Sequence, residues 1–140
     1  MNGDVTALGA ALDAEPSALN QPGPGGWTAL HLASHFGHIA CVDLLLARGA
    51  DVHARSGNDM RNLATHAAAA GRVPHARARI LQRLIEAGTP VDETQEGGYT
   101  ALHGACQNAD QASIDLLVRY GADLNKPADD GRTPDSLRRS

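Results

Sequence analysis

The sequence predicts an all-α protein in which pairs of short helices stack side by side. Residues 98–124 closely repeat residues 26–52, and internal repeats of this length are typical of stacked architectures. Within each copy, apolar residues recur at intervals of three and four, which is the spacing of one buried helix face. Aromatic residues make up 3% of the chain, so aliphatic and small side chains must form the core between closely packed helices. A chain of 140 residues is expected to form one domain.

A short, Ala-rich helix is expected to open each copy. It should begin after Thr28 in the first copy and after Thr100 in the last, because a threonine hydroxyl can accept an unpaired backbone N–H at a helix start. In the middle copy Asn62 takes the threonine position, and the histidine that follows each threonine at a distance of three is missing there. These first helices are expected at about 29–36, 63–70 and 101–108.

A second helix in each copy should carry the bulk of the core. Its apolar residues form one stripe per helix, and a glycine follows the stripe where a left-handed C-cap is favoured. The middle copy contains five extra residues near 72–76, which are expected to form an added contact loop. The second helices are expected at about 39–47, 77–86 and 111–119, followed by the glycines Gly49, Gly88 and Gly121.

Both ends of the chain look like incomplete copies. Pro134 follows Thr133 at the first helical position of a fourth copy, where proline is favoured. No second helix follows it, so a polar half-repeat cap is expected, with a longer array cut at Ser140 as the alternative. The single domain 1–140 is therefore expected to divide into an N-terminal cap (1–24), a repeat (25–57), a degenerate repeat (58–94), a repeat (95–129) and a C-terminal half-repeat cap (130–140).

The repeated pattern T-A-L-H-x-A, followed by L-L and G-A-D with a period of about 33 residues, resembles the ankyrin repeat. The resemblance implies a solenoid of antiparallel helix pairs with hairpin-like loop tips, about three full repeats long, with partial capping repeats. The proline of the family's T-P-L-H motif is replaced by Ala29, Leu63 and Ala101, which makes the helix starts less rigid. The middle copy is expected to lack the threonine–histidine hydrogen bond that is common in the family.

Bulk properties exclude several classes of function. The net charge is −4 at pH 7, which argues against a nucleic-acid binder. No apolar run is long enough for a membrane-spanning helix, and the acidic N-terminus lacks the basic start of a signal peptide. Cys41 and Cys106 lie in apolar helical patterns and are expected to be small buried residues in a reducing compartment, so we expect a cytoplasmic location. Arginine far outnumbers lysine, a bias that favours a bacterial origin.

The 7 histidines raise the alternative of a metal-dependent protein. His31 and His35 are one helical turn apart, with a further histidine and a cysteine just beyond. However, His31 and His103 occupy the same position of two copies, which is typical of hydrogen-bonded framework residues. The glycines at 22–27 lack the strand and the lysine of a phosphate-binding loop, and no catalytic constellation is evident. We expect no enzyme activity, no metal and no cofactor.

The resemblance also implies where a partner would bind. In ankyrin repeats the residues before the threonine and at the end of the first helix face the concave side, and the residue before the C-cap glycine is exposed. All four aromatic residues fall in such positions, and Trp, Tyr and Arg dominate binding hot spots. The alternative is that the rings only cover neighbouring side chains. The candidate partner-binding residues are Trp27, Arg61, Tyr99 and Arg132 before the threonine position, His35, Phe36, Gln107 and Asn108 at the helix ends, and Tyr120 before the last C-cap glycine.

Charge is the second functional feature. Between Arg61 and Arg83 the chain carries several arginines and no acid, which indicates either a solvated helix face or an electropositive middle repeat that faces an acidic partner. Together these patterns predict a monomeric, non-catalytic protein–protein interaction module that binds a protein partner through its concave face and loop tips, as an adaptor or regulator. The alternative is a dedicated inhibitor of one enzyme, similar to an immunity protein or antitoxin.

Overall fold

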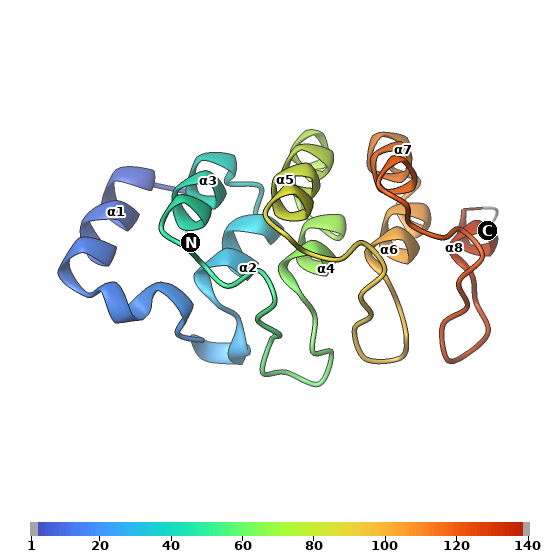
Figure 1. The fold of residues 1–140 in the computed structure, drawn as a ribbon, viewed down its shortest axis with the longest axis horizontal. Coiled ribbons are helices and arrows are strands. Elements are labelled where there is room, and N and C mark those ends of the chain that lie inside the picture. The colour runs from blue at the N-terminus through green and yellow to red at the C-terminus, as the bar shows by residue number, and fades with distance from the viewer. Residues whose placement is uncertain (1–2, 139–140) are drawn as a thin grey trace.

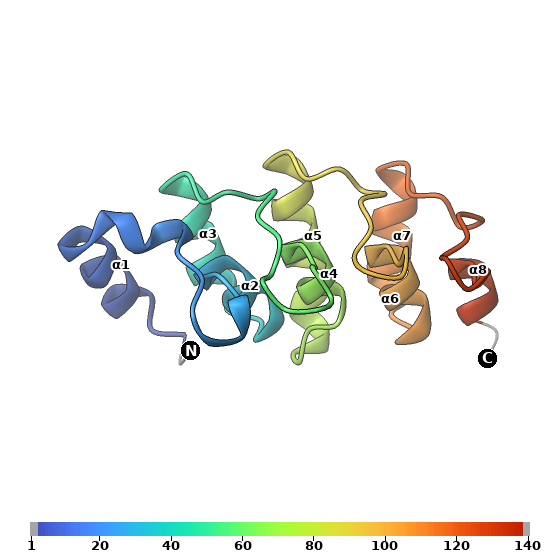
Figure 2. The ribbon, with the colours of Figure 1, turned by 90° about the horizontal axis from the view of Figure 1, so that it is seen from below.

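The protein is a row of helix pairs. The computed structural model describes residues 3–138, in which helices, turns and loops occur and no strand is found. The first helices of the pairs lie in one layer, the second helices lie in another, and the loops project beyond the first-helix layer (Figure 1). From the loop side, the loops follow one another along the row (Figure 2). The predicted all-α solenoid is confirmed. The outermost residues of the two expected caps, 1–2 and 139–140, lie outside the described residues.

The elements follow the expected order. At the N-terminal end, α1 (Val5–Ala14) packs on the second helix of the first pair and is followed by two 3-10 turns, η1 (Pro16–Asn20) and η2 (Pro24–Gly26). The three pairs are α2 (Ala29–His35) with α3 (Ile39–Ala47), α4 (Ala64–Ala69) with α5 (Pro74–Glu86), and α6 (Ala101–Gln107) with α7 (Gln111–Arg119), and α8 (Pro134–Leu137) ends the row against α6.

The predicted capping residues are found at the helix ends of the first and third pairs. The hydroxyl of Thr100 accepts the N–H of His103 at 3.4 Å and lies 2.9 Å from its Nδ1 atom. Thr28 has the same two contacts with His31. Gly121, which follows α7, has a φ of 99°, a left-handed conformation that glycine adopts at little cost.

The core lies between the two helix layers. Ala33, Ala68 and Ala105 occupy the same position of the three first helices, and each is 0% exposed, so the layers approach closely. Cys41 and Cys106 are buried and free, as predicted. None of the four aromatic residues is among the buried core residues of the described chain. The largest apolar side chains of the core come mainly from the second helices: Val42, Leu45, Ile80, Leu81, Leu84 and Leu117.

The start of the middle repeat differs from the prediction. Helix α4 begins at Ala64, so Leu63 rather than Asn62 is its N-cap residue, and His66 takes the histidine position that was expected to be vacant. The expectation that this repeat lacks the histidine is therefore wrong. Helix α4 has 6 residues where α2 and α6 each have 7. The predicted alignment of the middle repeat with the first is therefore one residue off at the start of α4. Because α4 is one residue shorter than α2, the alignment is correct again at its end.

The extra residues of the middle repeat lengthen its second helix. Helix α5 has 13 residues, whereas α3 and α7 each have 9. It begins at Pro74, because a proline at the first helical position loses no hydrogen bond there. The expectation of an added loop near 72–76 is therefore wrong, since most of the extra residues form about one additional helical turn at the start of α5.

Three histidines join each repeat to the next. The Nδ1 atom of His66 accepts the backbone N–H of Leu63 at 2.9 Å. The ring proton is therefore on Nε2, which donates to the carbonyl of Glu93 at 2.9 Å. This second bond joins α4 to the loop that leads from α5 to the third repeat. The equivalent bonds are those of His31 Nε2 with the Asn62 carbonyl at 2.8 Å and of His103 Nε2 with the Arg132 carbonyl at 3.0 Å.

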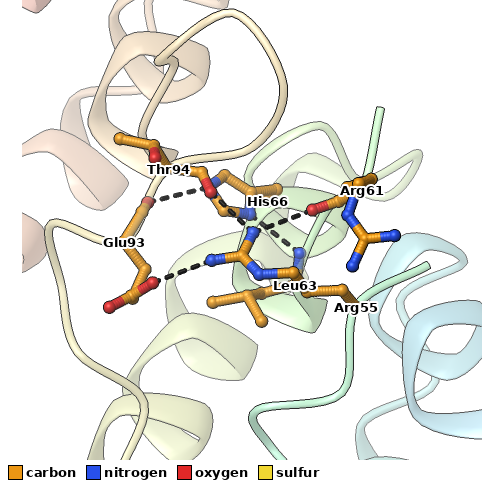
Figure 3. A network of polar contacts seen from close by, with 6 residues as sticks. All are labelled: Arg55, Arg61, Leu63, His66, Glu93 and Thr94. Atoms are coloured by element: carbon orange, nitrogen blue, oxygen red, sulfur yellow. Dashed lines mark hydrogen bonds and ion pairs between the residues drawn. The ribbon is translucent and has the colours of Figure 1, made fainter. Parts of the chain in front are cut away.

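Arg55 ties the two middle loops together (Figure 3). Its guanidinium donates to the carbonyl of Arg61 in its own loop, between α3 and α4, at 2.9 Å and to the carbonyl of Thr94 in the next loop, between α5 and α6, at 2.6 Å. It also pairs with the carboxylate of Glu93 at 2.8 Å. The backbone carbonyl of Glu93 also accepts the bond from His66. Residues 93–94, in the loop between α5 and α6, are therefore held from two sides.

Candidate binding groove

A groove runs along the first-helix layer and the bases of the loops. It has a volume of about 590 Å³. Residues of α2, α4, α6 and α8 line it together with loop residues, and no described residue of α3, α5 or α7 does so. Small residues form part of its lining, among them Ala67, Ala70, Ala101 and Gly104. The groove therefore lies on the face that the predicted binding residues were expected to occupy.

One residue from each repeat forms a row along this groove. The residues that directly precede the first helical caps are Trp27, Asn62, Tyr99 and Arg132, and all four line the groove. We refer to these four residues as the pre-cap row. The sequence placed Trp27, Tyr99 and Arg132 directly before a helix cap, where the structure also has them. It placed Arg61 in the fourth position because Asn62 was taken as the cap.

The aromatic members of the pre-cap row are supported by histidines. The ring of Trp27 meets His35 edge-on at 5.3 Å between centroids, and the ring of Tyr99 meets His103 in the same way at 5.3 Å. The hydroxyl of Tyr99 donates to the Asp130 carboxylate, and this bond raises the pKa of Tyr99. Both rings are half-buried, so each covers a neighbour and still presents a face to the groove.

Three predicted residues from the helix ends also line the groove, but two of them are used within the fold. His35 Nδ1 lies 3.3 Å from the carbonyl of Ala67, and Asn108 Nδ2 donates to the carbonyl of Ala69 at 3.1 Å. These side chains therefore satisfy carbonyls of α4 from both neighbouring repeats. Gln107 is exposed at the groove.

The remaining predicted residues lie elsewhere. The ring of Phe36 stacks on His38 and lies 6.0 Å from the guanidinium of Arg72, and it does not line the groove. Tyr120 follows α7, and its hydroxyl donates to Glu86 at 3.0 Å. Arg61 lies at a smaller hollow of about 340 Å³ among the loop tips. The structure therefore gathers six of the nine predicted residues at one site and leaves Phe36, Arg61 and Tyr120 outside it.

The arginines of the middle repeat do not form one basic face. Arg83 pairs with Asp43 of α3 at 2.6 Å, and Arg77 lies 3.9 Å from Asp110 beside α7. These contacts tie the second helices of neighbouring repeats together. Arg61 lies instead among the loop tips. The sequence left open a solvated helix face or a single electropositive surface, because clustering along the chain does not tell which element each arginine faces.

Met60 and Gln95 line the groove from loops, and no helical pattern in the sequence indicated them. Met60 is 45% exposed, and its carbonyl accepts the N–H of Glu96 from the next loop at 2.7 Å. Gln95 lines the same stretch of the groove. Helical periodicity carries no information on loops. The single available signal was the position of both residues shortly before a first helix.

The buried histidines have the chemistry of framework residues. Burial lowers the pKa of His66 from 6.5 to about 4, and burial also lowers the pKa values of His31 and His103. Both ring nitrogens of His66 are engaged with backbone groups. Among residues 3–138, no three His, Cys, Asp or Glu side chains converge in a way that could hold a metal ion. The longest described helix has 13 residues, and none is long and apolar enough to cross a membrane.

Known proteins share this repeat pattern. The ankyrin repeat family matches residues 25–57 and 97–129. Protein phosphatase 1 regulatory subunit 27 of Mus musculus is 29% identical over 135 residues, which cover 96% of this chain and 62% of that protein. The mouse B-cell lymphoma 3 protein homolog is 34% identical over 115 residues, 82% of this chain and 25% of that protein. Mouse ankyrin repeat and SOCS box protein 16 is 33% identical over 111 residues, 76% of this chain and 24% of that protein.

The chain thus spans less than two thirds of the length of each of these relatives. All three are mouse proteins, so they lend no support to the bacterial origin that the arginine bias favours. The family match omits the middle repeat, whose helix α4 is shortened and whose helix α5 is lengthened. The structure shows that a complete helix pair nevertheless occupies this place in the row.

Proposed function

Because the chain is an ankyrin repeat protein, we propose that it is a non-catalytic protein-binding module whose groove receives a protein partner. The observation that carries this proposal is the pre-cap row, in which a tryptophan, an asparagine, a tyrosine and an arginine from four successive repeats line one groove. Trp, Tyr and Arg combine a large contact area with a polar group, which is why they dominate binding hot spots.

The rigidity of the groove supports this proposal. The loops that carry Asn62 and Arg132 are held by His31 and His103, and Arg55 clamps the loop between the middle and third repeats. A surface that is already ordered loses little conformational freedom on binding, so more of the contact energy appears as affinity. The two free, buried cysteines fit the further proposal of a cytoplasmic location.

An acidic segment is the partner chemistry that the groove favours. Of the described residues that line it, Arg132 carries a permanent charge and none is Asp or Glu. The protein as a whole has a net charge of −4, and the Nε atom of Arg132 lies 3.6 Å from the carboxylate of Asp130, so an acidic partner group would share this guanidinium with Asp130. Binding should then weaken between low and physiological salt, because exposed charges are screened. An affinity that is independent of salt would contradict an acidic partner.

We propose the role of an adaptor or regulator, with a dedicated inhibitor as the second candidate. The relative that aligns with 96% of this chain is, by its name, a regulatory subunit, which favours the first. Affinity and stoichiometry separate the two. One partner enzyme, bound very tightly at 1:1 and inactivated, would indicate the inhibitor. We propose that the free chain is a monomer, which light scattering would test.

The decisive experiment is affinity capture of partners from the source cells with three baits. The double variant Trp27→Ala, Tyr99→Ala should lose the captured partner, with about 100-fold weaker binding after purification. Tyr120→Ala is the matched control, because it also removes an exposed ring but lies outside the groove. It should bind like the unmodified chain. Thermal unfolding must show that all three baits are folded. Unchanged binding by the folded double variant would refute the proposed site.

A further inference from the structure

The side chain of Asn62 has a buried hydrogen-bonding atom that the fold does not use. Asn62 is 9% exposed, and its Oδ1 atom has no hydrogen-bond partner among the described residues. Its backbone is fully used, because Ser56 Oγ accepts its N–H at 3.0 Å and its carbonyl accepts bonds from Ser56 and His31. An unpaired buried amide oxygen is unfavourable for folding. The fold therefore gives no reason for an asparagine at this position.

The surroundings of Asn62 would let a main chain approach it. It lies in the pre-cap row between Trp27 and Tyr99 and lines the groove together with several alanines and a glycine. Small lining residues such as Ala67 favour the approach of a backbone, and the two aromatic residues can contact side chains on either side of it. A carboxamide holds one acceptor and two donor protons in one plane, so it can pair with the N–H and the C=O of a peptide chain.

We infer that Asn62 binds the main chain of an extended segment of the partner. Its Nδ2 would donate to a partner carbonyl, and its Oδ1 would accept a partner N–H. Oδ1 is buried in the free chain, and the torsion about the Cβ–Cγ bond of asparagine is soft, so we expect the amide to rotate toward the groove when the partner binds. This inference rests on the proposed function, because it assumes that the groove binds protein.

The spacing of the repeats sets the length of the bound segment. Neighbouring first helices pack on the order of 8–10 Å apart, so Trp27 and Tyr99, two repeats apart, are separated by about 16–20 Å. An extended chain advances about 3.3–3.6 Å per residue. The partner side chains that contact the two rings should therefore be about five or six residues apart, with the residue held by Asn62 between them.

The test uses peptides. A library of random ten-residue peptides displayed on phage is selected on the unmodified chain, and binders that Trp27→Ala, Tyr99→Ala loses are kept. Each is then made with one backbone N-methyl group at successive positions, and its Kd is measured by fluorescence anisotropy. Asn62→Leu has a similar size and no polar atom, so it should keep or raise the melting temperature and weaken binding about 10- to 100-fold. Asn62→Ala serves if the leucine variant does not fold.

A main-chain contact has a specific signature. N-methylation at one central position should weaken binding to the unmodified chain as strongly as Asn62→Leu does, and it should have no further effect on that variant. The inference is overturned if Asn62→Leu binds normally, if the N-methyl effect persists in it, or if alanine at one partner side chain abolishes the dependence on Asn62 instead. It is also overturned if no groove-dependent peptide emerges. A captured partner that depends on Trp27 and Tyr99 would still leave the proposed function standing.

Discussion

The buried His66 should make the stability of the protein fall as the pH is lowered through 6.5. In the folded chain its pKa is lowered to about 4 by burial, and the ring is 6% exposed. Between pH 6.5 and 4 the unfolded chain therefore binds a proton that the folded chain does not, and stability rises with pH over this window. The full difference corresponds to about 3 kcal/mol, of which about 2 kcal/mol should be lost between pH 7.5 and pH 5.

Urea unfolding, followed by circular dichroism at pH 5, 6 and 7.5, measures this loss. The window stays above the range in which most carboxylates titrate. His66→Gln should be less stable at pH 7.5 but should show a shallower pH dependence, with the remainder contributed by His31 and His103, whose pKa values burial also lowers. His75→Gln, at an exposed site on α5, should keep the full dependence. Equal slopes for His66→Gln and the unmodified chain would refute the reasoning.

Three further changes test the framework by chemical denaturation. Thr100→Val should lower the free energy of unfolding by about 1–2 kcal/mol, because the hydroxyl caps α6 and contacts His103; a loss below about 0.5 kcal/mol would contradict the role of the cap. Ala109→Gly should raise the free energy of unfolding by about 0.5–1 kcal/mol, since Ala109 has a φ of 53°, a left-handed conformation that is strained for alanine. Ala112→Gly, within α7, should lower it by about 1 kcal/mol. A change of the same sign in both variants would show that Ala109 is not strained. Arg55→Met should cost about 1–3 kcal/mol and speed amide exchange in the two loops that it joins, and unaltered exchange would show that the clamp is not needed.

The fold was predictable wherever two copies confirm each other. The first and third repeats share residues from Thr28 and Thr100 onward, and their helices begin at the expected residues. The middle repeat misled the prediction because asparagine is a better N-cap residue than leucine. Alignment on the pattern A-x-H-x-A would have placed His66 correctly. The hydrogen bonds of its ring then compensate for the missing cap hydroxyl.

The site was predictable only in part, since its row depends on that same alignment. Trp27, Tyr99 and Arg132 followed from repeat positions, whereas Asn62 required the corrected start of α4. Contacts between repeats could not be read from the chain. The bond from Asn108 to a carbonyl of α4 depends on how two helices pack, and helical periodicity does not specify the partner of an exposed amide.

The hydrogen bonds of the three bridging histidines all run in the same direction along the row, toward its C-terminal end. Each buried ring donates its proton to a carbonyl of the loop that leads from its own helix pair to the following one, so the hydrogen bonds of each pair depend on the loop on its C-terminal side. Removal of α1 and η1 would leave all three bonds intact. Removal of the segment that contains Arg132 and α8 would leave His103 with a buried donor and no acceptor. The segment from Arg132 through α8 therefore supplies the acceptor that the third helix pair needs, as each loop does for the helix pair before it.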